Sequence, residues 1–560
     1  MSEQDVATYR RTGLLDLPIE LLSDISSLLS HQGILRLAST CRRLQETYKA
    51  SKALRYIVEL GAAGLVDGSH TCPLTLSERR GVFHARRAAW RKFQPERQTM
   101  AEFPDVWLAF DLAGGVYAHY TISRSPQLVL HWLPSRAFEE RRVEVDKMDI
   151  LVKDLAMDPS QDLIVFLEGH SLPHGAIFDD EPVGTDISGN LRLHLRSLQS
   201  QGQAPHELAA GSGTLNDVCP VHWAEVIEVF LVNDILAVFI GQERPVLRIW
   251  NWKSGRLLVS LDPEDFVAEQ FMTAHFAFIS DRAFVLTKTG SEARGPISIH
   301  LIALNHCTSS THGRTLLRDS VRLFLPRPHY DRRVPYILTK TGSFALPEPA
   351  RQIHNAAPTS RMHIFLIQAQ HDAFPLSNAP DVAVMVAVKT STLIRLLDRP
   401  SEAPRELPWI TWGPGNTRIV EHGEADGLSE RAVFGSRVVF STQYAEAPMT
   451  TEPWVHFLLD FHIPTCPDDD GVEVPHEDSL AERTQLVGCA ERTFDLGLRP
   501  EGPWWWTAED HTVDQLPCLC TRLRTTSFGL GDEVLMDDER FIRRRTFPDS
   551  EMEQTTTFRF

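Results

Sequence analysis

The sequence predicts an α+β multidomain protein, with a small all-α unit at the N-terminus and a large all-β body that forms an irregular β-propeller. Apolar residues recur at helical spacing up to about residue 60, whereas after about residue 100 short strand-like runs alternate with Gly, Pro, Asp and Asn. A loose repeat among these runs favours a propeller over a set of sandwiches. The expected segments are a flexible N-terminus (1–13), a helical domain (14–60), a helical linker (61–100), a propeller-like body (101–546) and a disordered tail (547–560).

The first helix is expected in the stretch LDLPIELLSDISSLL, because Asp16 can cap it and Pro18 suits a first turn. Its apolar positions follow 3.6-residue periodicity and comprise Leu21, Leu22, Ile25, Leu28 and Leu29. The run His31–Gly33 is expected to break the helix, and a second helical pattern follows it up to Tyr48. A third apolar patch ends at Gly61.

These N-terminal helices carry more apolar residues than their own hydrophobic core requires. A unit of about 45 residues buries too small a fraction of its surface to be stable in isolation. Its apolar residues cover more than one helix face, so a surplus remains after internal packing. Such a surplus marks a binding surface, or it packs on the β body.

The linker contains a basic helix in TLSERRGVFHARRAAWRKF, for which Ser77 is a candidate N-cap. Its basic residues are Arg79, Arg80, Arg86, Arg87, Arg91 and Lys92. Residues 1–100 carry 15 Lys and Arg against 10 Asp and Glu, whereas the whole chain has a formal charge of -18. The helix is therefore interpreted as a solvated face that can dock on the acidic body, and nucleic-acid binding is not expected.

The propeller prediction depends on a repeated unit of two alternating runs joined by a turn, followed by a further strand. It occurs as MDILVKDLAMDPSQDLIVFLEG, as AEVIEVFLVNDILAVFIG and as TAHFAFISDRAFVLTK. After the second copy, IWNWKSGRLL resembles the last two strands of a WD-type blade, with Lys-Ser-Gly in the turn.

The cellular setting is expected to be the cytoplasm or the nucleus. The eight cysteines are scattered without a CxxC pair, which in a chain of this size indicates free thiols in a reducing compartment. The N-terminus lacks the apolar core of a signal peptide, and no run approaches the roughly 18 apolar residues of a membrane helix.

Candidate chemical sites are weak, so neither an enzyme nor a cofactor is expected. Gly169-His170-Ser171 begins like a hydrolase nucleophile elbow, but Pro173 replaces the closing Gly and no helix pattern follows. His170, His174, Asp179 and Asp180 lack the spacing of a zinc site and are interpreted as an insertion loop. Cys518 and Cys520, near His511, are interpreted as packing on one side of a strand. The run Trp504–Trp506 is a candidate exposed aromatic patch.

The segment LPIELLSDISSLLSHQGILRLASTCRRLQE resembles the F-box, most specifically in its opening Leu-Pro-x-Glu-Leu-Leu. Scattered motifs elsewhere, including TWGPGNTR with GSRVVF and VLMDDERFI, resemble F-box proteins of the fungal, basidiomycete type. Ser26 and Ser27 depart from the more apolar pattern usual in the first helix.

The resemblance implies a substrate receptor of an SCF-type cullin–RING ubiquitin ligase. Its F-box would dock a Skp-type adaptor, and through it a cullin, while the β body holds an unidentified target protein. The residues implied for the F-box core and docking face are Leu17, Pro18, Leu21, Leu22, Ile25, Leu29, Ile34, Leu35, Leu37, Cys41 and Leu44. Pro18, Leu21 and Ile25 are assigned to docking. The alternatives are an interaction scaffold unconnected to a ligase and a serine hydrolase using Ser171.

Overall fold

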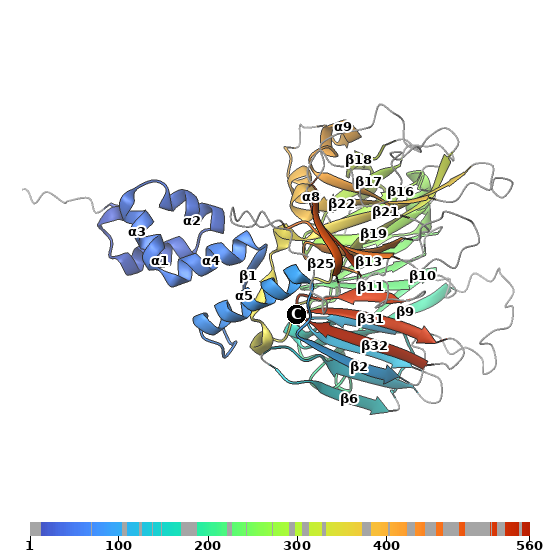
Figure 1. Ribbon diagram of the computed structural model, residues 1–560. Coiled ribbons are helices and arrows are strands. Elements are labelled where there is room, and N and C mark those ends of the chain that lie inside the picture. Colours follow the sequence, from blue (N-terminus) through green and yellow to red (C-terminus); the bar gives the residue numbers. More distant parts are fainter. Residues whose placement is uncertain are drawn as a thin grey trace, which may run out of the picture.

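The protein consists of a helical arm attached to one face of a seven-bladed β-propeller, as seen in this computed structural model (Figure 1). The structure describes residues 13–68, 70–103, 109–121, 126–136, 138–146, 148–169, 188–220, 227–241, 244–271, 273–289, 297–304, 313–326, 332–371, 382–400, 404–422, 432–442, 455–462, 481–487, 516, 518–523, 532–547 and 552–560. Within these ranges no helix is both long and apolar enough to cross a membrane.

The arm begins with a short 3-10 turn and four α-helices. They are η1 (Leu14–Asp16), α1 (Ile19–Ser27), α2 (His31–Ala38), α3 (Arg42–Ala50) and α4 (Lys52–Ala62). The predicted break at His31–Gly33 is misplaced, because α2 begins there. The chain leaves α1 one turn earlier, and Ser30 caps α2 by accepting a hydrogen bond from the Gly33 N–H (3.2 Å).

The linker is only partly helical, contrary to the prediction for residues 61–100. It contains β1 (Leu65–Asp67), α5 (Leu76–Lys92) and the start of β2 (Arg97–Phe103). Thr75 rather than Ser77 caps α5. In a reciprocal capping box, the Thr75 N–H donates to Glu78 Oε2 (2.7 Å) and the Glu78 N–H donates to Thr75 Oγ1 (3.4 Å).

The first three blades use consecutive strands of the chain, and so do the first four strands of blade four. Blade one contains β3 (Ala109–Ala113), β4 (Val116–Thr121), β5 (Gln127–Trp132) and β6 (Arg141–Asp146). Blade two contains β7 (Val152–Asp158), β8 (Leu163–Glu168), β9 (Ser188–Ser197) and β10 (Thr214–Pro220). Blade three contains β11 (Ile227–Val232), β12 (Ile235–Ile240), β13 (Val246–Asn251) and β14 (Arg256–Leu261). Blade four contains β15 (Ala274–Ser280), β16 (Ala283–Lys288), β17 (Ser298–Ala303), β18 (Val321–Phe324) and, parallel to β18, β23 (Glu406–Leu407).

Blades five and six carry long insertions, and blade seven joins a linker strand to three C-terminal strands. Blade five contains β19 (Arg332–Thr341), β21 (Met362–His371), β22 (Val382–Lys389) and β24 (Thr417–His422). Blade six contains β25 (Val433–Phe434), β26 (Arg437–Thr442), β27 (Val455–Asp460), β29 (Cys518–Leu523) and β28 (Ala481–Val487). Blade seven contains β30 (Glu533–Met536), β31 (Arg540–Phe547), β32 (Met552–Arg559) and β2. Short helices between strands are η2 (Pro159–Gln161), α6 (Pro263–Ala268), α7 (Gly313–Arg318), η4 (Pro349–Arg351), η5 (Pro358–Ser360), α8 (Thr390–Leu397) and α9 (Trp409–Trp412).

The core lies between neighbouring blades rather than in one centre. Successive innermost strands contact one another around the ring, from β3 through β7, β11, β15, β19 and β25 to β30. Buried clusters join adjacent sheets, and one of them packs Leu193 of blade two against Val238 and Trp250 of blade three. The three repeat copies read from the sequence begin blades two, three and four, which confirms the propeller prediction. The stretch IWNWKSGRLL forms the β13–β14 hairpin.

The predicted disordered tail at residues 547–560 is wrong for the residues that the structure describes there. Strand β32 lies between β31 and β2, so it closes the ring by joining the end of the chain to the linker (Figure 1). Phe558 and Phe560 are buried. The segment is mostly polar, but its threonines suit a strand, and pairing on both edges of β32 satisfies its backbone.

Candidate partner-docking site

The structure divides the eleven predicted F-box residues by burial. The buried members are Leu22, Ile34 and Leu44. The exposed members are Pro18, Leu21, Ile25, Leu29 and Leu35, and the half-buried members are Leu17, Leu37 and Cys41. The three residues assigned to docking therefore all lie on the surface, while helix packing uses a different set.

The F-box core is small and lies between α2 and α4. Ile34 packs with Leu54 and Val58, and Tyr48 adds partly buried surface to this cluster. Ser26 sits in the buried face of α1 because its Oγ donates to the Leu22 carbonyl (2.6 Å). This local bond explains how the sequence tolerates a serine at a position where the F-box pattern is usually apolar.

An exposed apolar surface covers the N-terminal half of the arm. We call it the leucine patch; its members are Leu14, Leu15, Ile19, Leu21, Ile25, Leu28, Leu29 and Leu35. These eight are more than half of the fifteen large hydrophobic side chains that are exposed in the described part of the chain. A concentration of exposed apolar side chains is typical of surfaces that bind another protein.

Four members of the leucine patch were not among the predicted site residues: Leu14, Leu15, Ile19 and Leu28. Leu28 is the most exposed of them, at 86%. A helical wheel of α1 places Ile19 beside Leu22 and Ser26 on the buried face, so helical spacing could not have flagged its exposure. Leu14 and Leu15 gave no signal either, since they lie in a single 3-10 turn.

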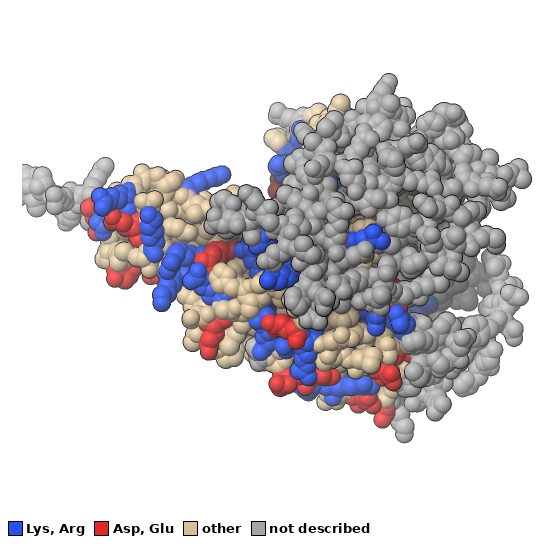
Figure 2. Space-filling view, in the orientation of Figure 1, with Lys and Arg blue, Asp and Glu red and all other residues tan. Residues whose placement is uncertain are grey.

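The arm is held to the propeller through α4 and α5. Tyr56 and Leu60 of α4 pack on Phe83 of α5, and Glu59 pairs with Arg80 (2.6 Å). Burial, reinforced by the neighbouring Asp67 carboxylate, raises the pKa of Tyr56. On the face shown in Figure 2, Lys and Arg side chains gather over this arm with Asp and Glu between them.

The predicted docking of the basic helix on the acidic body occurs at Arg86, one of the two buried arginines of α5. Arg86 Nη1 donates to Asp538 Oδ2 in the β30–β31 turn (2.7 Å), and its side chain is only 5% exposed. Trp90 donates from Nε1 to the Asp538 carbonyl (3.2 Å) and stacks on Phe560 with ring centroids 4.2 Å apart. Burial and the nearby Arg86 lower the pKa of His354 to about 2, which keeps that imidazole neutral beside α5.

A long insertion of blade five crosses the propeller face on the side of the arm. This cross-face segment, residues 342–361, leaves β19 and returns in β21. The Leu346 carbonyl accepts from the Ser160 N–H in blade two (3.1 Å), and Trp132 Nε1 in blade one donates to Glu348 Oε1 (2.7 Å). Blades one and two lie opposite blade five in the ring of seven blades. The cross-face segment therefore passes over the ends of the innermost strands.

The cross-face segment also binds the linker. Its strand β20 (His354–Ala356) pairs with β1, which places Val66 opposite Asn355. The Ser360 hydroxyl donates to the Gly64 carbonyl (2.7 Å). The face nearest the F-box is therefore occupied by the chain's own linker and insertion.

Several residues singled out in the sequence lie outside the described residues. They are His170, Ser171, His174, Asp179, Asp180, Trp504–Trp506, His511 and the N-terminal residues 1–12. Cys518 and Cys520 lie within the described residues. Both are buried in one cluster between blades five and six, which confirms the prediction that they pack on one side of a strand. Burial raises the pKa of both thiols.

Residues 14–47 match the family model of the F-box domain. The match ends within α3, so it covers η1, α1, α2 and all eleven predicted site residues. The protein thus combines an N-terminal F-box domain with a seven-bladed β-propeller. The comparison with curated proteins found no match.

Several solved structures resemble the chain at low sequence identity. The WD40 domain of SCAP from fission yeast is 9% identical, with a TM-score of 0.34 over 83% of this chain and 98% of that one. The Saccharomyces cerevisiae protein Sqt1 is 9% identical, with a TM-score of 0.30 over 83% and 99%. The computationally designed protein Ika8 is 9% identical, with a TM-score of 0.25 over 70% and 92%. The seven blades are defined by the strand pairing within this chain.

Proposed function

We propose that this protein is the substrate-recognition subunit of an SCF-type cullin–RING ubiquitin ligase. The observation that carries the proposal is the leucine patch, which lies on the residues that match the F-box domain. F-box domains bind Skp-type adaptors, and exposed leucines that the arm does not bury are suited to an obligate apolar interface of this kind.

We further propose that the target protein binds the propeller on the face away from the arm. The cross-face segment, β1 and α5 already cover the near face. Rigid β scaffolds commonly carry their recognition residues on the connections between strands. In this role the protein positions a target for ubiquitin transfer and makes or breaks no bond itself.

The proposal places the protein in the cytoplasm or the nucleus, where cullin–RING ligases act. The scattered motifs that resemble basidiomycete F-box proteins suggest a fungal member of this group.

Co-purification with a Skp-type adaptor and a cullin tests the proposal. The full chain should retain the adaptor, whereas the variant Pro18→Ala/Leu21→Ala/Ile25→Glu should lose it. Leu21 and Ile25 are 47% and 41% exposed, so these changes leave the helix core intact. Val267→Glu is the matched control, because Val267 is an exposed apolar residue of α6 on the propeller. Equal adaptor binding by the triple variant would refute the proposal.

An interaction scaffold without a ligase connection is the second candidate, and a deletion separates the two. Removal of residues 1–50 takes away α1 to α3 but keeps Tyr56 and Leu60, which pack on α5. A receptor predicts that the propeller keeps its melting temperature and loses only the adaptor. A scaffold whose helices stabilise the body predicts unfolding of the propeller. A hydrolase would require Ser171, and undiminished esterase activity in Ser171→Ala would dispose of that reading.

A further inference from the structure

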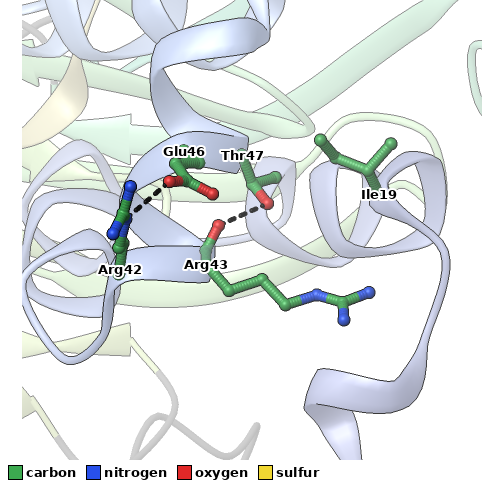
Figure 3. Close-up of a pocket in the computed structure, with 5 residues that line it drawn as sticks. All are labelled: Ile19, Arg42, Arg43, Glu46 and Thr47. Carbon is green, nitrogen blue, oxygen red and sulfur yellow. Dashed lines mark hydrogen bonds and ion pairs between the residues drawn. The ribbon is translucent and has the colours of Figure 1, made fainter.

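A shallow hollow of about 520 Å³ opens beside the leucine patch, between the start of α1 and helix α3 (Figure 3). Ile19 forms its apolar side. The other lining residues all belong to α3 and are Arg42, Arg43, Glu46 and Thr47. An apolar wall next to charged groups suits the border of a protein interface, where a buried apolar centre passes into a polar rim.

The two arginines of the hollow differ in what they contact. Arg42 Nε pairs with Glu46 Oε1 (2.9 Å), but both side chains are largely in solvent, so this pair contributes little to stability. Arg43 extends the other way, towards the side of the hollow where Ile19 lies (Figure 3). Its Nη2 donates to the Leu17 carbonyl (2.8 Å) at the junction between η1 and α1.

The Leu17 bond orients the guanidinium of Arg43 before any partner arrives. It uses one of the five N–H donors of the group. No ion pair joins Arg43 to a carboxylate among the residues that the structure describes. The guanidinium therefore presents a fixed positive fork at the edge of an apolar surface, and its immobilisation costs less entropy on binding than that of a free arginine.

We infer that Arg43 receives a carboxylate side chain of the adaptor, while the leucine patch contacts the adaptor's apolar surface. This inference rests on the proposed function, since the same partner occupies both. The patch supplies most of the affinity, and the Arg43 pair fixes the register of the helices against the partner. The acceptor is thus an acidic residue at the rim of the adaptor's F-box-binding surface.

Titration of the full chain with the purified Skp-type adaptor tests the inference. Arg43→Glu should weaken binding by about tenfold or more, because two like charges then meet at the rim. Arg43→Met should weaken it less and should flatten the dependence of affinity on salt concentration. Lys49→Glu is the control, since Lys49 is exposed on the same helix but does not line the hollow.

A charge-swap experiment distinguishes the loss of an ion pair at Arg43 from a loss of local structure in the arm. Each Asp and Glu on the adaptor's F-box-binding surface is replaced in turn by Lys and titrated against Arg43→Glu. Restored affinity with one of them establishes the pair, and restoration with none overturns the inference. Wild-type affinity and salt dependence in Arg43→Glu would also overturn it, while leaving the proposed function in place if Leu21→Ala/Ile25→Glu abolishes binding. If the wild-type chain does not bind the adaptor at all, the proposed function itself fails.

Discussion

Ile34 and Leu35 are neighbours in α2 that serve different interactions. Ile34 is 2% exposed and packs with Leu54 and Val58, whereas Leu35 is 44% exposed. Consecutive helical residues point about 100° apart, so one face of α2 can stabilise the fold while the next remains available to a partner. The same division separates Leu22 from Leu21 in α1.

This division predicts that two similar substitutions in α2 affect different properties, one the stability of the F-box and the other the affinity for the adaptor. Ile34→Ala should destabilise the F-box by about 3 kcal/mol, because it opens a cavity in a small core. Leu35→Ala should change stability by less than about 0.5 kcal/mol and should reduce adaptor affinity. Amide hydrogen exchange in α1 to α4 measures the first effect, and titration with the adaptor measures the second. Similar exchange rates in the two variants would contradict the assigned division.

Much of the F-box site could be predicted from its sequence, since Leu-Pro-x-Glu-Leu-Leu and helical spacing locate all eleven predicted residues in or next to the right helices. Spacing could not assign core and surface roles, because these depend on where α3 and α4 pack. It also could not reveal Arg43, whose side chain is oriented by a hydrogen bond to the carbonyl of Leu17, 26 residues earlier in the chain. In the body, alternation predicts the blades, but the partner strands of a polar segment such as β32 are set by distant residues.

At the scale of elements, the cross-face segment links the linker to blades one and two. It passes close to Gly114 in the β3–β4 turn, where a Cβ would lie 2.4 Å from the Leu346 carbonyl oxygen. Gly114 also has a φ of +54°, a conformation that other residues adopt only at a cost. This contact allows the segment to lie flat against the propeller while β20 pairs with β1.

Because of this close approach, we expect Gly114→Ala to lower the stability of the protein by more than backbone strain alone would. Gly211→Ala is the matched control, because Gly211 has a φ of +60° and a Cβ added there would meet no atom within 4 Å. Both variants carry a left-handed strain of about 1 kcal/mol. Only Gly114→Ala should additionally displace residues 342–361 and expose β1 to proteolysis. Equal melting temperatures for the two variants would show that the segment does not press on this turn.

For the whole molecule, the arrangement of blades buries many histidines in their neutral form. Burial lowers the pKa of His119, His300 and His363 to about 3 and that of His456 to about 4. An unfolded chain titrates its histidines near a pKa of about 6.5. Below that pH the unfolded state binds more protons than the folded state, so stability falls as the pH falls.

The protein should therefore lose stability from about pH 6.5 downwards, by about 2 kcal/mol per buried histidine between pH 7 and pH 5. The loss continues until the folded-state pKa values of about 3 to about 4 are reached. His363→Gln should reduce the pH dependence by about one histidine's share, since Gln retains a donor for Thr339 but does not titrate. His70→Gln, at an exposed position, serves as the control. Chemical unfolding at a series of pH values measures the slope, and an unchanged slope in His363→Gln would contradict the assignment of acid sensitivity to the blade interfaces.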